Sequence, residues 1–145
     1  MRRMLSFLLL LSLAACAGSS TKAGRPANMP QPDIAAQLVN PLFFGSTNSA
    51  PATLEIRVLN RGQAPLVVRR VELDSPGMGQ YSLLRYARQY NETVPPGETK
   101  ALTAFATAVA QTTRRPTEPL TIRAIVELQS EGTIWREIAI FREHL

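Results

Sequence analysis

Alternation of apolar and polar residues with a period of two is the pattern that most constrains how this chain can fold. Leu54, Ile56 and Val58 fall on one side of an extended chain. Glu55 and Arg57 fall on the other side. A strand with one apolar and one polar face is half-buried in a sheet. The chain is therefore expected to form sheets whose apolar faces another layer must cover.

A turn follows this strand. Residues 60–65 contain asparagine, glycine and proline, each of which favours a turn for its own backbone reason. A second extended run follows at residues 66–73, so the two runs are predicted to form a hairpin. The apolar pattern changes phase in the middle of the second run, and a bulge is therefore expected near Arg69 and Arg70.

A second hairpin is predicted near the end of the chain. Residues 120–128 and 133–141 are both rich in isoleucine and other strand-forming residues, and a short polar turn at residues 129–132 separates them. Further strands are expected at residues 37–44, interrupted or ended by Pro41, and at residues 100–106, after a Pro-Pro-Gly-Glu turn.

One segment in the middle of the chain fits two patterns. Tyr81, Leu83 and Arg85 alternate as they would in a strand. Leu83, Tyr86 and Tyr90 also fall on one face of a helix. Because the neighbouring segments have strand patterns, a helix here would be an insertion into a β framework. We favour an extended segment, with a helix as the alternative.

Six or seven short strands separated by turns predict one antiparallel β-sandwich rather than a βαβ fold. The run at residues 54–73, followed by Val-Pro-Pro-Gly-Glu-Thr-Lys at residues 94–100, resembles the immunoglobulin-like sandwiches of many exported bacterial proteins. The chain lacks the cysteine pair of antibody domains. The resemblance implies an all-β, immunoglobulin-like sandwich of about seven strands, in a class of domains that bind or scaffold more often than they catalyse.

The N-terminal residues have the form of a secretory leader that ends at Cys16, the only cysteine of the chain. Arg2 and Arg3 precede an apolar run at residues 5–13, and two alanines follow it. The sequence Leu-Ala-Ala-Cys at residues 13–16 resembles the lipobox of bacterial lipoproteins. This resemblance implies cleavage before Cys16 and attachment of lipid to its sulfur.

Two alternatives to lipidation are weaker. The apolar run falls short of the roughly 20 residues that a membrane-spanning helix needs. A conventional secreted chain would carry the thiol of Cys16 unpaired in an oxidising compartment. The leader therefore predicts a lipid-anchored protein of the bacterial cell envelope. Ala17 is not aspartate, which in enteric-type sorting favours the outer membrane.

The predicted organisation has three parts. Residues 1–15 form the signal peptide, and residues 16–32 form a lipidated N-terminus with a flexible linker rich in proline, glycine and serine. Residues 33–145 form the β-sandwich domain.

Charge argues against a nucleic-acid partner. Loss of Arg2 and Arg3 with the leader lowers the formal charge from +5 to +3, and the remaining arginines are scattered along the chain. Nucleic-acid binding would need a basic stripe interleaved with aromatic residues. The partners expected are the membrane, through lipid on Cys16, and an envelope protein or polysaccharide.

The sequence contains little that indicates catalysis. His144 is the only histidine, so a histidine and cysteine metal centre is not expected, nor is a cofactor. Nucleotide-binding glycine motifs and the Gly-x-Ser-x-Gly motif are absent. Glu72 with Asp74, or Glu127 with Glu131, are the carboxylate pairs that an acid and base mechanism could use. On a strand, Glu72 and Asp74 would share one solvated face. No catalytic or metal-binding residue is predicted, and the protein is not expected to be an enzyme.

Aromatic residues of the last strand give the remaining candidate site. Trp135 and Phe141 fall on one side of this strand, opposite three isoleucines, so both sides are apolar. Either the aromatic side packs in the core, which is the favoured reading, or Trp135 and Phe141 form an exposed binding surface.

The predicted function is a non-catalytic binding or assembly module anchored in the cell envelope. The alternative is a structural envelope lipoprotein without a small-molecule ligand.

Overall fold

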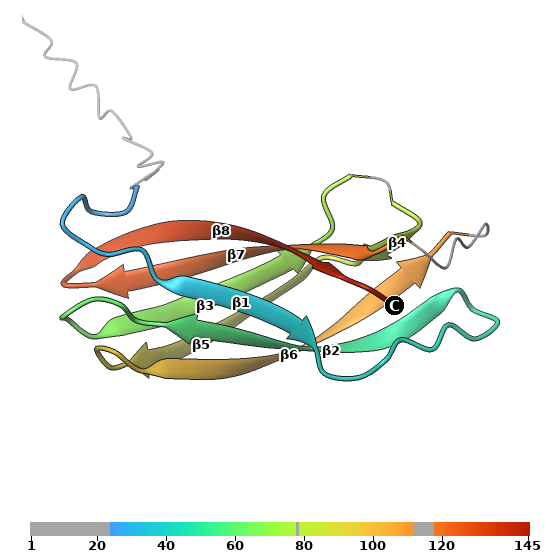
Figure 1. The fold of residues 1–145 in the computed structure, drawn as a ribbon, viewed down its shortest axis with the longest axis horizontal. Helices are drawn as coiled ribbons and strands as arrows, with labels where there is room; N and C mark the ends of the chain where they lie inside the picture. The colour runs from blue at the N-terminus through green and yellow to red at the C-terminus, as the bar shows by residue number, and fades with distance from the viewer. Residues whose placement is uncertain (1–23, 78, 112–117) are drawn as a thin grey trace, which may run out of the picture.

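The computed structural model describes residues 24–77, 79–111 and 118–145. In these residues the chain forms eight antiparallel strands in two sheets and no helix (Figure 1). No helix in this part of the chain could cross a membrane. The predicted all-β sandwich is confirmed, whereas Cys16 and its leader lie outside the described residues.

Each sheet contains four strands. The first, called the β2–β6 sheet, has the order β1 (Asp33–Leu38), β2 (Ser49–Leu59), β6 (Thr99–Ala110) and β4 (Tyr81–Leu83). The second, called the β3–β7 sheet, has the order β5 (Tyr86–Val94), β3 (Leu66–Asp74), β7 (Leu120–Ser130) and β8 (Thr133–Glu143).

Six of the strands have the spatial order of an immunoglobulin domain. The orders β1-β2-β6 and β3-β7-β8 correspond to the strand orders A-B-E and C-F-G. β4 and β5 differ, because the chain first pairs with β6 and only then crosses to pair with β3. The immunoglobulin-like assignment therefore stays a prediction within the confirmed sandwich.

The ambiguous middle segment is extended. Tyr81–Leu83 is β4 and Tyr86–Val94 is β5, and the two residues between them carry the chain from one sheet to the other. The helical alternative is wrong. The apparent helical spacing arose because this change of sheet interrupts the alternation expected of a single strand.

The first predicted hairpin is wrong. The strands on either side of the turn at residues 60–65, β2 and β3, lie in different sheets, so this turn carries the chain across the sandwich and does not join paired strands.

The predicted bulge is confirmed. The register of β3 shifts between Val68 and Arg70 against both of its neighbours, β5 and β7. The shift keeps Val68 and Val71 buried on the same face although they are three residues apart.

The opening strand begins earlier than predicted. The structure places it at Asp33–Leu38, whereas residues 37–44 were expected, and it ends before Pro41. Beyond the end of β1, the side chain of Asn40 provides a further hydrogen bond to β2, since its Oδ1 accepts from the Thr53 amide at 3.1 Å. Pairing with β2 decides the boundary, since Ala36 lies opposite Ile56 in the core.

The core lies between the two sheets and is built from alternate residues of each strand. Along β7 every second residue is buried, and Leu54, Ile56 and Val58 of β2 are fully buried as predicted. Among the largest buried side chains is Trp135, which is 1 % exposed.

Trp135 therefore belongs to the core, and its alternative role in an exposed binding surface is wrong. The β7–β8 register places Trp135 opposite Leu128, whose side chain is also fully buried. Phe141 lies on the same side of β8 and is partly buried against the core. The outward side of β8 carries the isoleucines instead, with Ile138 63 % exposed and Ile140 60 % exposed.

The described part of the predicted linker, residues 24–32, contacts the sandwich. Met29 is partly buried against the core, and its amide donates to the Pro26 carbonyl in a turn. Arg25 reaches Glu137 of β8, with 3.4 Å between Nη1 and Oε1. The chain thus enters the domain beside the end of β8 that contains Trp135.

Replacement of Trp135 tests this assignment. Trp135→Ala should lower the free energy of unfolding by about 3–5 kcal/mol, because it removes a fully buried aromatic side chain. Phe105→Ala, at a position of β6 that is 65 % exposed, should change it by no more than about 0.5 kcal/mol. Urea unfolding followed by circular dichroism measures both. Equal losses for the two variants would contradict the burial of Trp135.

Candidate interaction surface

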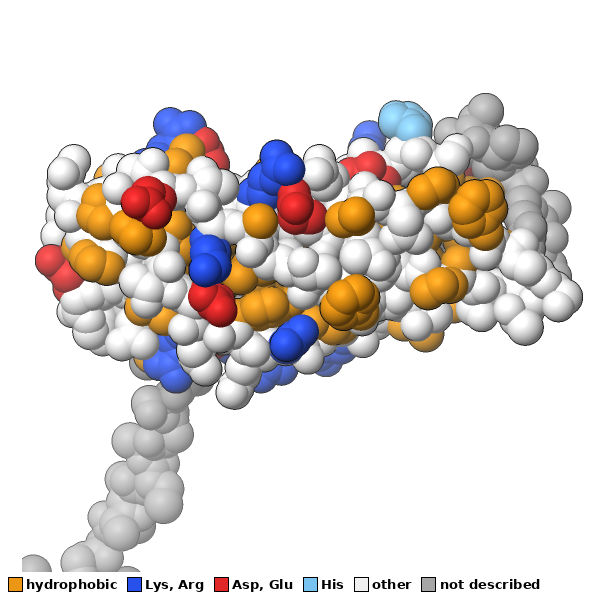
Figure 2. Space-filling model, turned by 90° about the horizontal axis from the view of Figure 1, so that it is seen from below, with side chains coloured by type: hydrophobic (Ala, Val, Ile, Leu, Met, Phe, Trp, Pro, Cys, Tyr) orange, Lys and Arg blue, Asp and Glu red, His pale blue; other side chains and the backbone are white. Residues whose placement is uncertain are grey.

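The side of the sandwich formed by β5 and β6 is closed by side chains. The Tyr90 hydroxyl donates to the Thr103 carbonyl of the other sheet at 2.8 Å. The Tyr86 hydroxyl lies 3.2 Å from the Tyr90 hydroxyl. Burial raises the pKa of Tyr90. Lys100 pairs with Glu92 at 3.1 Å. Figure 2 shows this side, where hydrophobic side chains lie in separate groups with basic and acidic side chains between them.

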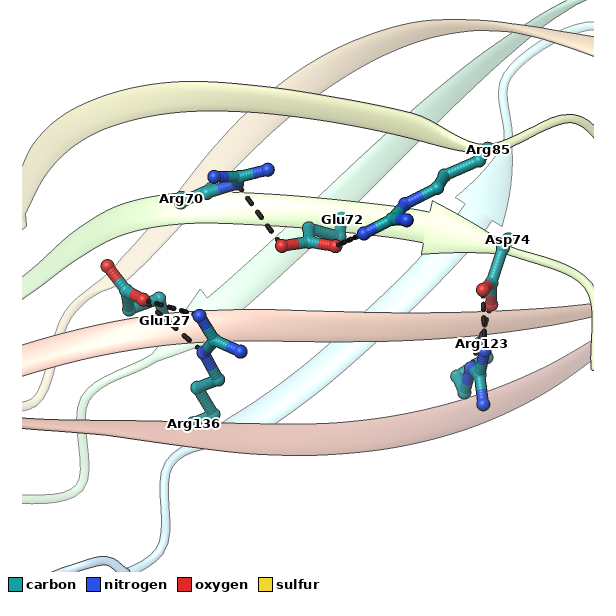
Figure 3. Close-up of polar contacts among 7 residues, drawn as sticks. All are labelled: Arg70, Glu72, Asp74, Arg85, Arg123, Glu127 and Arg136. Atoms are coloured by element: carbon teal, nitrogen blue, oxygen red, sulfur yellow. Dashed lines mark hydrogen bonds and ion pairs between the residues drawn. The ribbon is translucent and has the colours of Figure 1, made fainter. Parts of the chain in front are cut away.

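The outer face of the β3–β7 sheet has a different character, because arginines and carboxylates alternate across its strands (Figure 3). Glu72 and Asp74 point outward because Val71 and Leu73 point into the core. This confirms the prediction that the two carboxylates share a solvated face. We call this surface the arginine face and define it by Arg69, Arg70, Glu72, Asp74, Arg85, Arg123, Glu127, Arg136 and the outward isoleucines of β8, Ile134, Ile138 and Ile140.

Cross-strand register brings the charges of this face together. Asp74 lies opposite Arg123 on β7, and Glu127 of β7 lies opposite Arg136 on β8. Opposite charges in such positions attract each other directly. The arginines, scattered in the sequence, are therefore gathered by the strand pairing.

Asp74 and Arg123 form the tightest pair. Arg123 Nε donates to Asp74 Oδ1 at 2.8 Å, and Nη2 donates to Oδ2 at 2.5 Å. This bidentate geometry matches the planar guanidinium to the carboxylate. The hydrogen bonds from Arg123 hold the pKa of Asp74 below its ordinary value, although burial opposes this.

Glu72 is held between two arginines. Arg85 Nη2 donates to Oε2 at 2.8 Å, and Arg70 Nε lies 3.2 Å from Oε1 (Figure 3). The hydrogen bond from Arg85 is the main cause that lowers the pKa of Glu72, and the charge of Arg70 adds to it. Both carboxylates of β3 are therefore ionised at neutral pH.

Glu127 is held in the same way. Arg136 Nη2 donates to its Oε2 at 3.2 Å, and Arg69 Nε lies 3.8 Å from its Oε1. Glu131, which the sequence offered as its partner in a carboxylate pair, lies in the β7–β8 turn. The structure therefore pairs Glu127 with arginines and not with a second acid.

The carboxylates of the arginine face lie below the arginines. The side chain of Glu72 is 14 % exposed, whereas that of its partner Arg85 is 72 % exposed. Five arginines also outnumber the three carboxylates in this network. The surface that a partner would meet is therefore positive, because the carboxylates are paired beneath the arginines and are fewer than them.

Exposed isoleucines border these arginines. Ile134, Ile138 and Ile140 lie on the outward side of β8, on either side of Arg136. The sequence showed that β8 is apolar on both sides but did not reveal which side is buried. The sequence analysis named Trp135 and Phe141 as the candidate binding surface, and it therefore did not find this combination of exposed aliphatic and guanidinium groups.

A cavity of about 270 Å³ lies at the end of the sandwich beside Trp135. Asn60, which lines this cavity, has a buried side-chain amide. Its Nδ2 donates to the carbonyls of Ala64 and Val94, and its Oδ1 accepts from the Gly62 amide. These bonds hold the turn between β2 and β3, so this polar group has a structural role.

The other residues considered for chemistry are not brought together. His144 is exposed and borders a shallow hollow formed with residues 38–42. Within residues 24–77, 79–111 and 118–145, no group of three histidine, cysteine or acidic side chains is placed to hold a metal ion.

Comparison with protein families and with curated proteins gave no match. Solved structures do resemble the fold. An X-ray structure of the structural genomics target SoR45 has a TM-score of 0.56 and 12 % identity, covering 79 % of this chain and 86 % of that one. A Bordetella pertussis protein provisionally named ApaA has a TM-score of 0.50 and 18 % identity, covering 79 % and 92 %. At these identities the likeness shows the fold alone.

The lowered pKa values predict an acid-sensitive contribution to stability. Glu72 and Asp74 have pKa values below the ordinary 4.5 and 3.8, so their stabilisation is complete above those values. It is lost as the pH falls through the lower values of the folded state. The double variant Glu72→Gln and Asp74→Asn should lower Tm at pH 7 by about 2–5 °C and flatten the fall of Tm in acid.

Thermal unfolding followed by circular dichroism between pH 7 and pH 2.5 checks this, with Glu131→Gln in the exposed turn as control. A double variant that loses as much Tm in acid as the wild type would contradict a stabilising role for these two pairs.

Proposed function

We propose that this protein is a bacterial lipoprotein of the cell envelope, held to the membrane by lipid on Cys16, and that its sandwich is a non-catalytic binding or assembly module. In this proposal the arginine face contacts an acidic surface of an envelope protein. The leader ending in Leu-Ala-Ala-Cys supports the anchor, and Ala17 favours the outer membrane.

The observation that carries the binding role is the layering of charge on the arginine face. Its carboxylates orient the guanidinium groups from below, and the exposed arginines are left in excess. Guanidinium groups held in place offer donors that fit carboxylates with little loss of conformational entropy. Arginine is also enriched in protein interfaces, whereas most other charged residues are depleted there.

The apolar part of the surface favours a protein over a polysaccharide as partner. Ile138 and Ile140 offer aliphatic area beside the guanidinium groups. No aromatic side chain points outward from the described strands of this sheet, so the flat stacking surface that an aromatic ring provides is missing from this face.

A structural envelope lipoprotein without a small-molecule ligand is the second candidate. The observation that favours it is that Glu72, Asp74 and Glu127 are all paired within the sheet. Such a network can serve to hold the strands in register without any partner.

The anchor is tested by mass spectrometry of the mature protein purified from bacterial membranes. The N-terminal fragment should begin at Cys16 and carry the added mass of a diacylglyceryl group, with an acyl group on its amine. Cys16→Ala should abolish both the cleavage and the lipid. A mature chain with an unmodified Cys16 thiol would contradict the proposal.

The arginine face is tested by crosslinking in intact cells. Arg136→Glu should weaken capture of the partner by about tenfold or more, since it puts a negative charge where a positive one met an acidic surface. Arg57→Glu is the matched control, because Arg57 is similarly exposed and paired with a glutamate, but on the β2–β6 sheet.

Equal capture by the two variants would exclude the arginine face as the binding surface. Capture of glycan fragments in place of protein would indicate a polysaccharide partner, and recovery of bulk membrane proteins alone would favour the structural candidate.

A further inference from the structure

The four edge strands of the sandwich are protected to different degrees. An exposed edge exposes unpaired backbone groups that can pair with another chain, and natural edges are usually short, bulged, charged or covered. β4 has three residues, and β1 has six and ends before Pro41. β5 is bulged, because Tyr90 and Asn91 both fall opposite Arg69 of β3, and it is joined to β6 through Tyr90.

β8 lacks most of these protections, although it carries charged residues and β1 of the other sheet lies near it. It is eleven residues long, contains no proline, and pairs with β7 without a break in register. Apart from its ladder with β7, none of its backbone groups has a backbone hydrogen bond with the described residues, those of segment 24–32 included.

The β7–β8 turn shows which backbone groups of β8 are free. Glu131 and Gly132 have φ values of +47° and +79°, as in a two-residue type I′ turn. Such a turn is closed by a hydrogen-bonded pair, here Ser130 with Thr133. Odd-numbered residues of β8 therefore bond to β7, and the even-numbered ones direct their N–H and C=O groups away from it.

The residues with free backbone groups are also the exposed ones. They are Ile134, Arg136, Ile138, Ile140 and Arg142. The open edge and the exposed isoleucines thus coincide at the middle of the strand, around Ile138.

We propose that β8 pairs with β8 of a second copy of this chain, antiparallel and around a twofold axis at Ile138. The two β3–β7 sheets then form one continuous sheet, and the pairing is isologous and closed. This inference goes beyond the proposed function and does not depend on lipidation.

The charges of β8 support a second copy as the occupant and select this register. Arg136 meets Ile140 of the partner subunit, and Glu137 meets Ala139 of the partner subunit. A shift of the axis to position 137 would place Glu137 against its own copy. A shift to position 139 would place Arg136 against Arg142 of the partner subunit. Like charges directly opposite each other destabilise a sheet.

The remaining pairs are also compatible in this register. Ile138 meets its own copy, and Ile134 lies against the aliphatic part of Arg142 of the partner subunit, which can keep its guanidinium in water. On the inner side, Trp135 is opposite Phe141 of the partner subunit. Each charged side chain of β8 therefore lies opposite an uncharged one.

Disulfide trapping tests the register. In the full chain carrying Cys16→Ala, Ile138→Cys places the only thiol at the axis, where paired Cα atoms lie about 5.5 Å apart, within disulfide range. Mild oxidation in detergent should convert most of the chain to a covalent dimer. Ile134→Cys should give little, because the two copies of this position would be roughly 27 Å apart.

Phe105→Cys, an equally exposed position on the β2–β6 sheet, is the control for random collision. Failure of Ile138→Cys to crosslink above this control, or stronger crosslinking by Ile134→Cys, would overturn the proposal.

Sedimentation of the full chain with Cys16→Ala in detergent tests the dimer without a crosslink. Ile138→Lys should raise the dimer Kd by about 100-fold or more, whereas Phe105→Lys should leave it unchanged. Ile138→Pro removes one outward amide without removing a bond to β7, and it should also give monomer. Circular dichroism verifies that each variant is folded. A Cys16→Ala chain without a further substitution that is monomeric at high concentration, or a folded Ile138→Lys variant that stays dimeric, would refute the pairing.

Discussion

The register of the β7–β8 hairpin is the constraint on which the candidate surface depends. The two-residue turn at Glu131 and Gly132 places Trp135 opposite Leu128, and both side chains enter the core. A slip of one residue would exchange the two sides of the strand, so that isoleucines would be buried and the tryptophan exposed. The same register sets Glu127 opposite Arg136 and directs the even-numbered backbone groups of β8 outward.

The ion pairs of the arginine face hold the guanidinium groups in place more than they stabilise the fold. Exposed pairs contribute little to folding, because water screens them and long side chains lose entropy when they are held. The apolar layer between the sheets supplies the main stabilisation, with β7 buried at every second position. The carboxylates instead hold the guanidinium groups in place, so that a positive surface is built on a sheet that is stable for other reasons.

Local pattern was sufficient for most strands. The β7–β8 hairpin, the bulge beside Arg69 and Arg70, and the shared face of Glu72 and Asp74 followed from turn residues and alternation, which neighbouring residues determine. The hairpin predicted from β2 and β3 was wrong, because a turn sequence does not show whether the chain pairs with itself or crosses to the other sheet. The bounds of the opening strand and the change of sheet between β4 and β5 could not be predicted from local pattern. Both depend on partners distant in sequence, because Ala36 is placed by its pairing with Ile56.

The sequence by itself determined that the chain forms antiparallel sheets with one buried face each, and it carries the lipobox at Cys16 from which the anchor is proposed. It could not determine which apolar side of β8 is buried, since Trp135 and the isoleucines are both suited to a core. Only the tertiary structure decided this, because the space opposite Leu128 between the sheets accepts one side of the strand and leaves the other to solvent. Strand pairing likewise brought the scattered arginines onto one face, through contacts between residues as distant in sequence as Asp74 and Arg123.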